Sequence, residues 1–160
     1  QFTVARKLAG GGKMLATSLK DQSSFTRYGQ QMEEFETSAD LTKQARLAAR
    51  TLVTRPDEPK ANRVMGIFSL VVAQESDEAM KFLARSSNKD CEFIAKYDGS
   101  FDDTDAEIAM KLADCWRQVG KKNSAAEKLA IERAKEVLVR AKQKAQGKDL
   151  KAIESRLERL

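Results

Sequence analysis

The chain has 160 residues, of which 41% are hydrophobic, 33% are charged and only 6% are aromatic. It contains no histidine, and its two cysteines, Cys91 and Cys115, lie too far apart for a CxxC redox pair. These counts exclude Ser–His–Asp and Cys–His catalysis, His-containing zinc sites and zinc held by a thiolate cluster. We therefore expect no cofactor and no metal site, and we expect two free thiols rather than a disulfide.

The composition favours helices throughout. Ala, Lys, Glu, Leu and Arg are abundant and proline occurs only twice, at Pro56 and Pro59. Such residues lose little conformational freedom in a helix, whereas proline breaks one. The sequence predicts an all-α fold, an antiparallel array of about eight or nine helices joined by short loops. No apolar run is long enough to span a bilayer, so we expect no transmembrane segment.

In chain order, the first feature is the glycine-rich run "AGGGK" at residues 9–13. A phosphate-binding loop needs a preceding strand and a Ser or Thr after the lysine, and both are missing here. We expect a flexible break between two helices, because three helical glycines are costly. After it, a helix face formed by Phe25, Tyr28, Met32 and Phe35 leads to Asp40. We expect Asp40 to cap a further helix that stops before Pro56.

Beyond Pro56 the pattern predicts a series of shorter helices. Pro59 fits the first turn of a helix that runs through residue 73. We predict helix starts at Ser76, Ser87, Thr104 and Ser124, and helix ends at Gly120 and Gly147. Residues 1–160 thus read as one helical-repeat domain, with leading helices in 1–55 and degenerate repeats plus a closing helix in 56–160. The chain begins without methionine, and we expect it to be the C-terminal part of a longer protein.

Two stretches indicate an internal repeat of paired helices. In the clearer one, Leu112, Ala113 and Trp116 share one helix, and Ala134, Leu138 and Ala141 share the next. This pattern resembles the tetratricopeptide repeat, although nine extra residues separate the two helices. Small residues at Ala113 and Ala134 would let the helices approach closely, while Trp116 and Leu138 fill the space between them. Trp116 should therefore be buried and the neighbouring Arg117 exposed.

The other stretch follows Pro56. Met65 and Gly66 match the bulky-small pair of the tetratricopeptide pattern, Phe68 replaces its aromatic residue, and Ala79 and Leu83 approximate its second helix. More specifically, residues 40–160 resemble a C-terminal helical region of planctomycete proteins of unknown function. Its markers are "RPDEPKANRVMG", "LADCWRQVG" and "IESRLERL". The resemblance implies a scaffold rather than an enzymatic reaction.

Catalysis has little support in the sequence. Cys115 lies beside Asp114 and Trp116, but a nucleophilic cysteine needs a base or a helix N-terminus to lower its pKa, and Cys115 is predicted in mid-helix. Neighbouring acid pairs such as Asp102 and Asp103 would diverge on a helix. We name no catalytic residue and expect the protein not to be an enzyme.

The favoured function is a protein-interaction or scaffold module that closes a longer helical solenoid. Tetratricopeptide-like repeats bind peptides along their first helices. Placing the family's contact positions on this chain gives Lys60, Arg63, Asp114, Arg117 and Gln118 as the polar candidates for partner binding. The partner would be a protein or peptide of unknown identity, and the sequence contains no signal for a cellular location.

The alternative is nucleic-acid binding through the C-terminal helices. Residues 121–160 contain twelve Lys or Arg and six Asp or Glu, whereas the first 120 residues are nearly balanced. Such basicity could neutralise phosphates. However, acids interrupt the basic residues at helical spacing and no aromatic residue follows Trp116 to stack on bases, which makes this alternative the weaker one.

Overall fold

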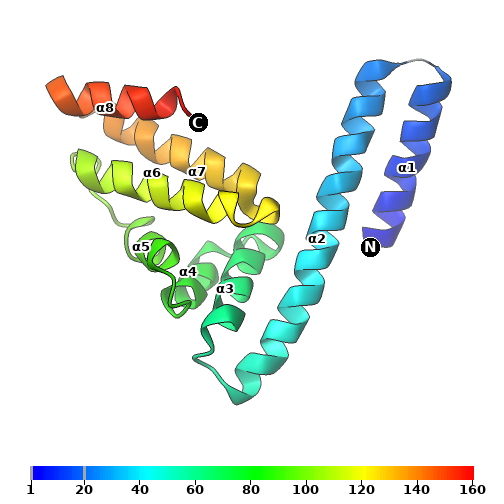
Figure 1. The fold of residues 1–160 in the computed structure, drawn as a ribbon, viewed down its shortest axis with the longest axis horizontal. Coiled ribbons are helices and arrows are strands. Elements are labelled where there is room, and N and C mark those ends of the chain that lie inside the picture. Colours follow the sequence, from blue (N-terminus) through cyan, green and yellow to red (C-terminus); the bar gives the residue numbers. More distant parts are fainter. Residues whose placement is uncertain (1, 20) are drawn as a thin grey trace. The chain divides into compact units, whose positions relative to one another are not determined.

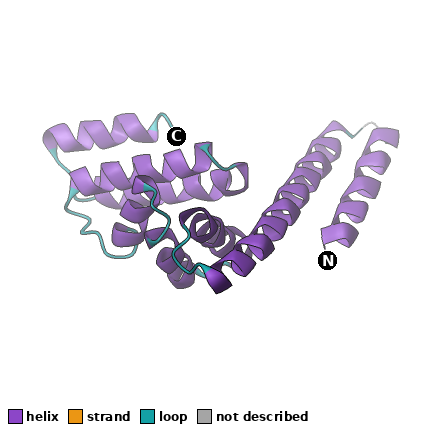
Figure 2. Ribbon diagram, turned by 60° about the horizontal axis from the view of Figure 1, so that its bottom comes forward, coloured by secondary structure: helices purple, strands orange, loops and turns teal. Residues whose placement is uncertain are grey.

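A computed structural model describes residues 2–19 and 21–160 of the chain. Within this part, 81% of the residues are helical and no strand occurs (Figure 2). The prediction of an all-α protein is therefore confirmed, with eight α-helices over the residues described. They are α1 (Phe2–Ser18), α2 (Gln22–Thr54), α3 (Pro59–Phe68), α4 (Ser76–Ala84), α5 (Lys89–Tyr97), α6 (Ala106–Lys121), α7 (Ser124–Lys142) and α8 (Gly147–Leu157).

The contacts within the chain divide it into two compact units. Unit 1 comprises Gln1–Gln44 and unit 2 comprises Ala45–Leu160. The division falls inside the long helix α2, which begins in unit 1 and ends in unit 2 (Figure 1). Each unit is described on its own below.

In unit 1, the expected break at the glycine run is wrong, because α1 continues through Gly10, Gly11 and Gly12. The close approach of α2 explains the glycine at position 12. A Cβ atom at Gly12 would lie 2.7 Å from the ring of Tyr28. The chain instead breaks between Ser18 and Gln22, where Asp21 accepts a bond from the Ser24 amide at 3.1 Å.

The predicted helix start at Asp40 is also wrong. Helix α2 runs without interruption for 33 residues, and Asp40 lies inside it. No glycine or proline occurs between residues 30 and 54 to end the helix. Hydroxyl side chains inside it donate hydrogen bonds to backbone carbonyl oxygens of the preceding turn. The Thr42 hydroxyl, for example, donates to the Ser38 carbonyl at 2.8 Å. The predicted end before Pro56 is confirmed, since α2 ends at Thr54.

The first short helix of unit 2, α3, begins at Pro59, as the sequence predicts. Pro59 occupies the first turn of α3, and the Ala61 amide donates to the Glu58 carboxylate at 2.6 Å. The buried Asn62 side chain donates to the carbonyl of Pro56 at 2.8 Å, which fixes the preceding turn. Helix α3 continues into a π-helical turn, η1 (Ser69–Ala73), which ends at Gln74 with a left-handed φ of 59°.

The side chains predicted to cap the next helices each lie one position from the observed N-cap, although α4 and α7 do begin at Ser76 and Ser124. The N-cap positions are Glu75, Asn88, Asp105 and Asn123, not the neighbouring serines and threonine. Asn88 and Asp105 accept bonds from backbone amides three residues further on, at 3.0 and 2.9 Å. At these two helices the Asn or Asp side chain takes the cap position rather than the adjacent Ser87 or Thr104, since Asn and Asp are among the strongest N-caps.

The two glycines predicted to end helices have different roles. Gly120 lies inside α6, where an added Cβ would come within 3.0 Å of the Ala130 Cβ on α7. Its small size therefore permits close packing between these helices rather than termination. Gly147 does adopt a left-handed φ of +57°, but it begins α8, whereas α7 ends at Lys142.

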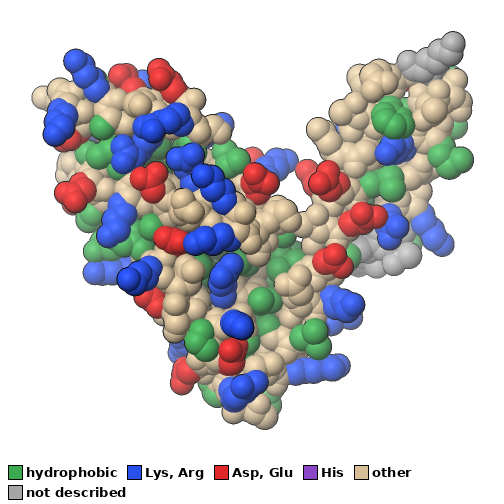
Figure 3. All heavy atoms as spheres, viewed as in Figure 1, with side chains coloured by type: hydrophobic (Ala, Val, Ile, Leu, Met, Phe, Trp, Pro, Cys, Tyr) green, Lys and Arg blue, Asp and Glu red, His purple; other side chains and the backbone are tan. Residues whose placement is uncertain are grey.

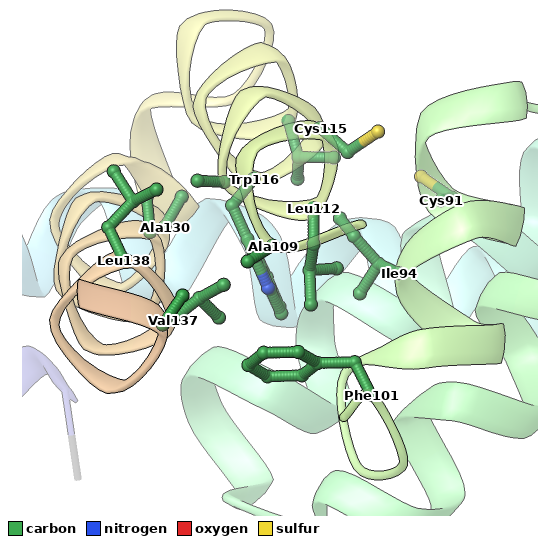
Figure 4. Close-up of a cluster of buried hydrophobic side chains, with 14 of the residues drawn as sticks. Cys91, Ile94, Phe101, Ala109, Leu112, Cys115, Trp116, Ala130, Val137 and Leu138 are labelled. Atoms are coloured by element: carbon green, nitrogen blue, oxygen red, sulfur yellow. The ribbon is translucent and has the colours of Figure 1, made fainter. Parts of the chain in front are cut away.

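The hydrophobic core of unit 2 gathers around Trp116. Helices α6 and α7 pack along each other, and α8 contacts both (Figure 1). Figure 4 shows Trp116 among Leu112, Val137 and Phe101, all members of one buried cluster. The Trp116 side chain is 1% exposed, so the prediction that it fills the core is confirmed. The cluster also includes all six residues of the clearer repeat stretch: Leu112, Ala113, Trp116, Ala134, Leu138 and Ala141.

Helices α3 and α4 form a second closely packed pair. A Cβ atom at Gly66 would lie 2.5 Å from Leu83 Cδ2 and 3.3 Å from the Ala79 carbonyl oxygen. Ala79 and Leu83 are themselves fully buried. Glycine at position 66 is thus required by the contact between the two helices.

Candidate interaction surface

The polar side of α6 carries three of the predicted contact residues: Asp114, Arg117 and Gln118. They lie opposite the face that buries Ala109, Leu112 and Trp116, because residues three and four apart share one side of a helix. Gln118 is exposed, and Asp114 and Arg117 are partly exposed. This side of α6 is therefore open to a partner along part of its length.

Asp114 is the centre of a small ionic cluster. Its carboxylate lies 3.8 Å from the Arg117 guanidinium on the next turn and 3.4 Å from Arg156 Nε of α8. Arg156 was not among the residues predicted from the sequence. No local pattern could identify it, since the two partners are 42 positions apart and meet only when α8 packs on α6.

The prediction that Arg117 is exposed is correct only in part. Its side chain is 28% exposed. The stem of an arginine covers apolar surface while its charged end reaches polar groups, and here the guanidinium is near Asp114. Arg117 therefore has less freedom to meet a partner than its position on α6 predicts.

The other predicted residues, Lys60 and Arg63, lie on α3. Lys60 is exposed and Arg63 is half-buried. The charge of Arg63 acts on the Cys91 thiol of α5, lowering its pKa against the larger effect of burial. Asp114 has the opposite effect on Cys115 of α6, because its negative charge raises the pKa of that thiol in the same direction as the larger effect of burial. The structure thus brings Arg63 and Asp114 within electrostatic range of the two thiols, but among the described residues no hydrogen bond or ion pair joins the α3 residues to those of α6.

The two cysteines are free and buried between α5 and α6. Their sulfur atoms point toward each other in Figure 4. Burial raises the pKa of both thiols, and it raises the pKa of Cys115 to about 11. A thiol that holds its proton so firmly is a poor nucleophile. The expectation of free thiols is confirmed, and the arrangement gives Cys115 no means of activation.

A bond that the sequence did not predict links Trp116 to the end of α5. The indole Nε1 donates to Asp98 Oδ1 at 2.7 Å. Burial raises the pKa of the Asp98 carboxyl, and the bond from Trp116 opposes that rise. Asp98 therefore satisfies the one polar atom of a buried indole, which is a structural role.

Several basic residues of the C-terminal helices form ion pairs. Arg133 contacts Glu136 at 3.3 Å, Arg140 contacts Asp103 at 2.7 Å and Lys142 contacts Glu154 at 3.1 Å. Figure 3 shows Lys and Arg side chains interspersed with acidic ones over this part of unit 2. On the face seen in Figure 3, acidic side chains thus interrupt the positive charge of this part of the chain.

Two other kinds of site, a metal site and a membrane-spanning helix, were sought among the described residues. No group of three or more Cys, Asp or Glu side chains is placed to hold a metal ion among these residues. Over the same residues, no helix has both the length and the apolar character needed to cross a bilayer. Comparison with protein-family models, curated proteins and solved structures gives no match.

Proposed function

We propose that unit 2 is a non-catalytic protein-interaction module of the tetratricopeptide-like type, built from antiparallel helix pairs that stack as a short solenoid. The observation that supports this most directly is the close packing of α3 on α4 and of α6 on α7. In both pairs, small residues at the predicted repeat positions, Gly66 in the first and Ala113 and Ala134 in the second, are buried.

The partner contacts in this proposal are Lys60 and Arg63 on α3 and Asp114, Arg117 and Gln118 on α6. Three of these five residues are cationic, and Arg156 adds a further positive charge beside Asp114. A protein or peptide segment that carries carboxylates fits such a surface, because arginine binds carboxylates through two parallel hydrogen bonds. The exposed Lys60 and Gln118 add direct contacts to the partner in this proposal.

The closing helix α8 completes the module as a cap. Its buried Ile153 faces the core, while exposed Lys151 and Glu158 face outward. A terminal repeat needs such a polar outer face to end a solenoid. In this proposal unit 2 closes a longer array, and α8 itself supplies Arg156 to the contact surface.

The experiment is a capture of partners from native lysate by three forms of the whole chain. We expect Arg63→Glu with Arg117→Glu to lose the proteins that the unchanged chain recovers. A matched control, Lys135→Glu with Lys144→Glu, alters the net charge equally but on exposed positions of α7 and the loop after it. Recovery of the same proteins by the first variant would refute the proposed surface.

Because Arg63 and Arg117 are half-buried, their reversal can also disturb folding. The variant Lys60→Ala with Gln118→Ala changes only exposed residues and should weaken capture without lowering thermal stability. The Lys135 and Lys144 control also addresses nucleic-acid binding, the weaker alternative. Loss of bound RNA or DNA in that control alone would favour the alternative over the interaction module.

A further inference from the structure

Helix α1 has an apolar stripe outside its contact with α2. Val4, Leu8 and Leu15, with Leu19 directly after the helix, are separated by 4, 7 and 4 positions and so share one face. Their exposed fractions are 62%, 71%, 65% and 77%. We call these four residues the exposed stripe. Figure 3 shows hydrophobic side chains at the surface of unit 1.

The face of α1 beside the stripe packs on α2 through small residues. Ala9 and Ala16 are each 4% exposed, and Gly12 lies against Tyr28. Arg6 adds an ion pair to Glu36 at 3.1 Å. Helix α1 thus uses its small side chains to meet α2 and leaves its large apolar ones outside, the reverse of an ordinary globular helix. Such an exposed apolar face usually marks a site of association.

The charge on this helix has one sign. The first 20 residues of the chain contain four Lys or Arg and no Asp or Glu. Lys7 is exposed and lies seven positions before Met14, which is 75% exposed, so the two share one edge of the stripe. Lys13 lies over the Phe25 ring at 4.7 Å. Lys13 is thus on the side of α1 that meets α2, and Lys7 is the basic residue beside the stripe. An apolar face with a basic edge is typical of helices that bind anionic membrane surfaces.

We propose that α1 docks on the surface of an anionic lipid bilayer, with the exposed stripe in the boundary between headgroups and acyl chains and Lys7 among the lipid phosphates. A protein groove is the other kind of site that takes an amphipathic helix face, but the first 20 residues, which carry four basic and no acidic side chains, favour an anionic surface. A second copy of the chain would bring like charges together at Lys7. A bilayer supplies both an apolar layer and the opposite charge. This inference concerns unit 1 and is independent of the function proposed for unit 2.

The test is sedimentation of the whole chain with vesicles of phosphatidylcholine alone and of phosphatidylcholine with phosphatidylserine. We expect binding to the anionic vesicles only, reduced by added salt. Leu8→Ala with Leu15→Ala should weaken that binding by more than about tenfold, because two buried leucine side chains are lost from the interface while helix propensity is kept. Lys7→Glu should weaken it by about fivefold or more.

The matched control is Leu47→Ala with Val53→Ala, which removes two exposed apolar side chains of α2 outside the stripe. This control should bind anionic vesicles as the unchanged chain does. The proposal is overturned if the unchanged chain does not bind anionic vesicles. It is also overturned if Leu8→Ala with Leu15→Ala binds them as strongly as Leu47→Ala with Val53→Ala. It is also overturned if light scattering shows a dimer that the α1 variant disrupts, or if that variant lowers the melting temperature, because the stripe would then be covered by protein.

Discussion

At the scale of single residues, Trp116 is the largest fully buried side chain among the described residues. It is buried in the core, and its only polar atom is satisfied by Asp98 at 2.7 Å. The apolar spacing of α6 predicts the burial of Trp116. It could not predict Asp98, which lies 18 positions earlier and reaches the indole only through the packing of α5 on α6.

The raised pKa of Asp98 predicts a pH dependence of stability. A carboxyl whose folded pKa lies above the ordinary 3.8 binds its proton more tightly when folded, so its contribution to stability falls as the pH rises through that interval. Asp98→Asn keeps an acceptor for Trp116 and removes the charge. We expect this variant to gain stability relative to the unchanged chain as the pH rises from about 3 to 7, measured by urea unfolding. A difference that stays constant over this range would contradict the assignment.

The buried thiols predict low chemical reactivity. With a pKa of about 11, Cys115 carries about one thiolate per thousand molecules at pH 8. We expect neither Cys91 nor Cys115 to react with iodoacetamide in the folded protein at pH 8 over an hour, and both to react in urea, as read by mass spectrometry. Rapid labelling of Cys115 in the folded state would instead indicate an activated thiol.

At the scale of helices, the sequence predicts the helical class and the packing faces better than the breaks. Apolar spacing and Pro59 correctly place α3 and the buried side of α6. The sequence predicts a break or a helix end at Gly12 and at Gly120, yet each lies inside a helix where a neighbouring helix approaches closely. A glycine required by a neighbouring helix cannot be told from a flexible one without that neighbour, which explains the errors.

The close contact at Gly66 predicts a specific destabilisation. Gly66→Ala would improve helix propensity by about 1 kcal/mol. However, its Cβ would lie 2.5 Å from the buried Leu83 and force α3 and α4 apart. Overpacking costs about 1 to 3 kcal/mol, and we expect a net loss in the free energy of unfolding, measured in urea.

The control for this prediction is Gly11→Ala, since nothing lies within 4 Å of a Cβ at that position of α1. We expect it to increase helicity by circular dichroism, or at least to leave it unchanged. If Gly66→Ala were as harmless as Gly11→Ala, α3 and α4 would not be packed as closely as described.

At the scale of the whole molecule, the chain consists of two compact units, and both the main buried cluster and the ionic cluster lie in unit 2. The buried cluster around Trp116 draws only on residues from Leu70 to Ile153, all within unit 2. The ionic cluster of Asp114, Arg117 and Arg156 also lies within unit 2. The sequence could suggest five contact residues and the local pair of Asp114 with Arg117, but the contact of Asp114 with Arg156 depends on α8, which no local pattern relates to α6.

This division predicts that unit 2 folds alone. A fragment of residues 45–160 retains the entire cluster, so we expect cooperative urea unfolding with Trp116 fluorescence close to that of the whole chain. The free energy of unfolding of unit 2 should change by less than about 1 kcal/mol, because no core residue is removed. A fragment with non-cooperative unfolding would show that unit 1 is needed to form the core.

The central claim is that the surface of α3 and α6 binds a protein partner. The most direct test is the dissociation constant of a captured partner, measured by calorimetry for the unchanged chain, for Lys60→Ala with Gln118→Ala, and for the Lys135→Glu and Lys144→Glu control. We predict that the surface variant binds at least about tenfold more weakly, the loss expected for two contact residues, and that the control binds as the unchanged chain does. Equal affinity for all three proteins would contradict the proposed surface.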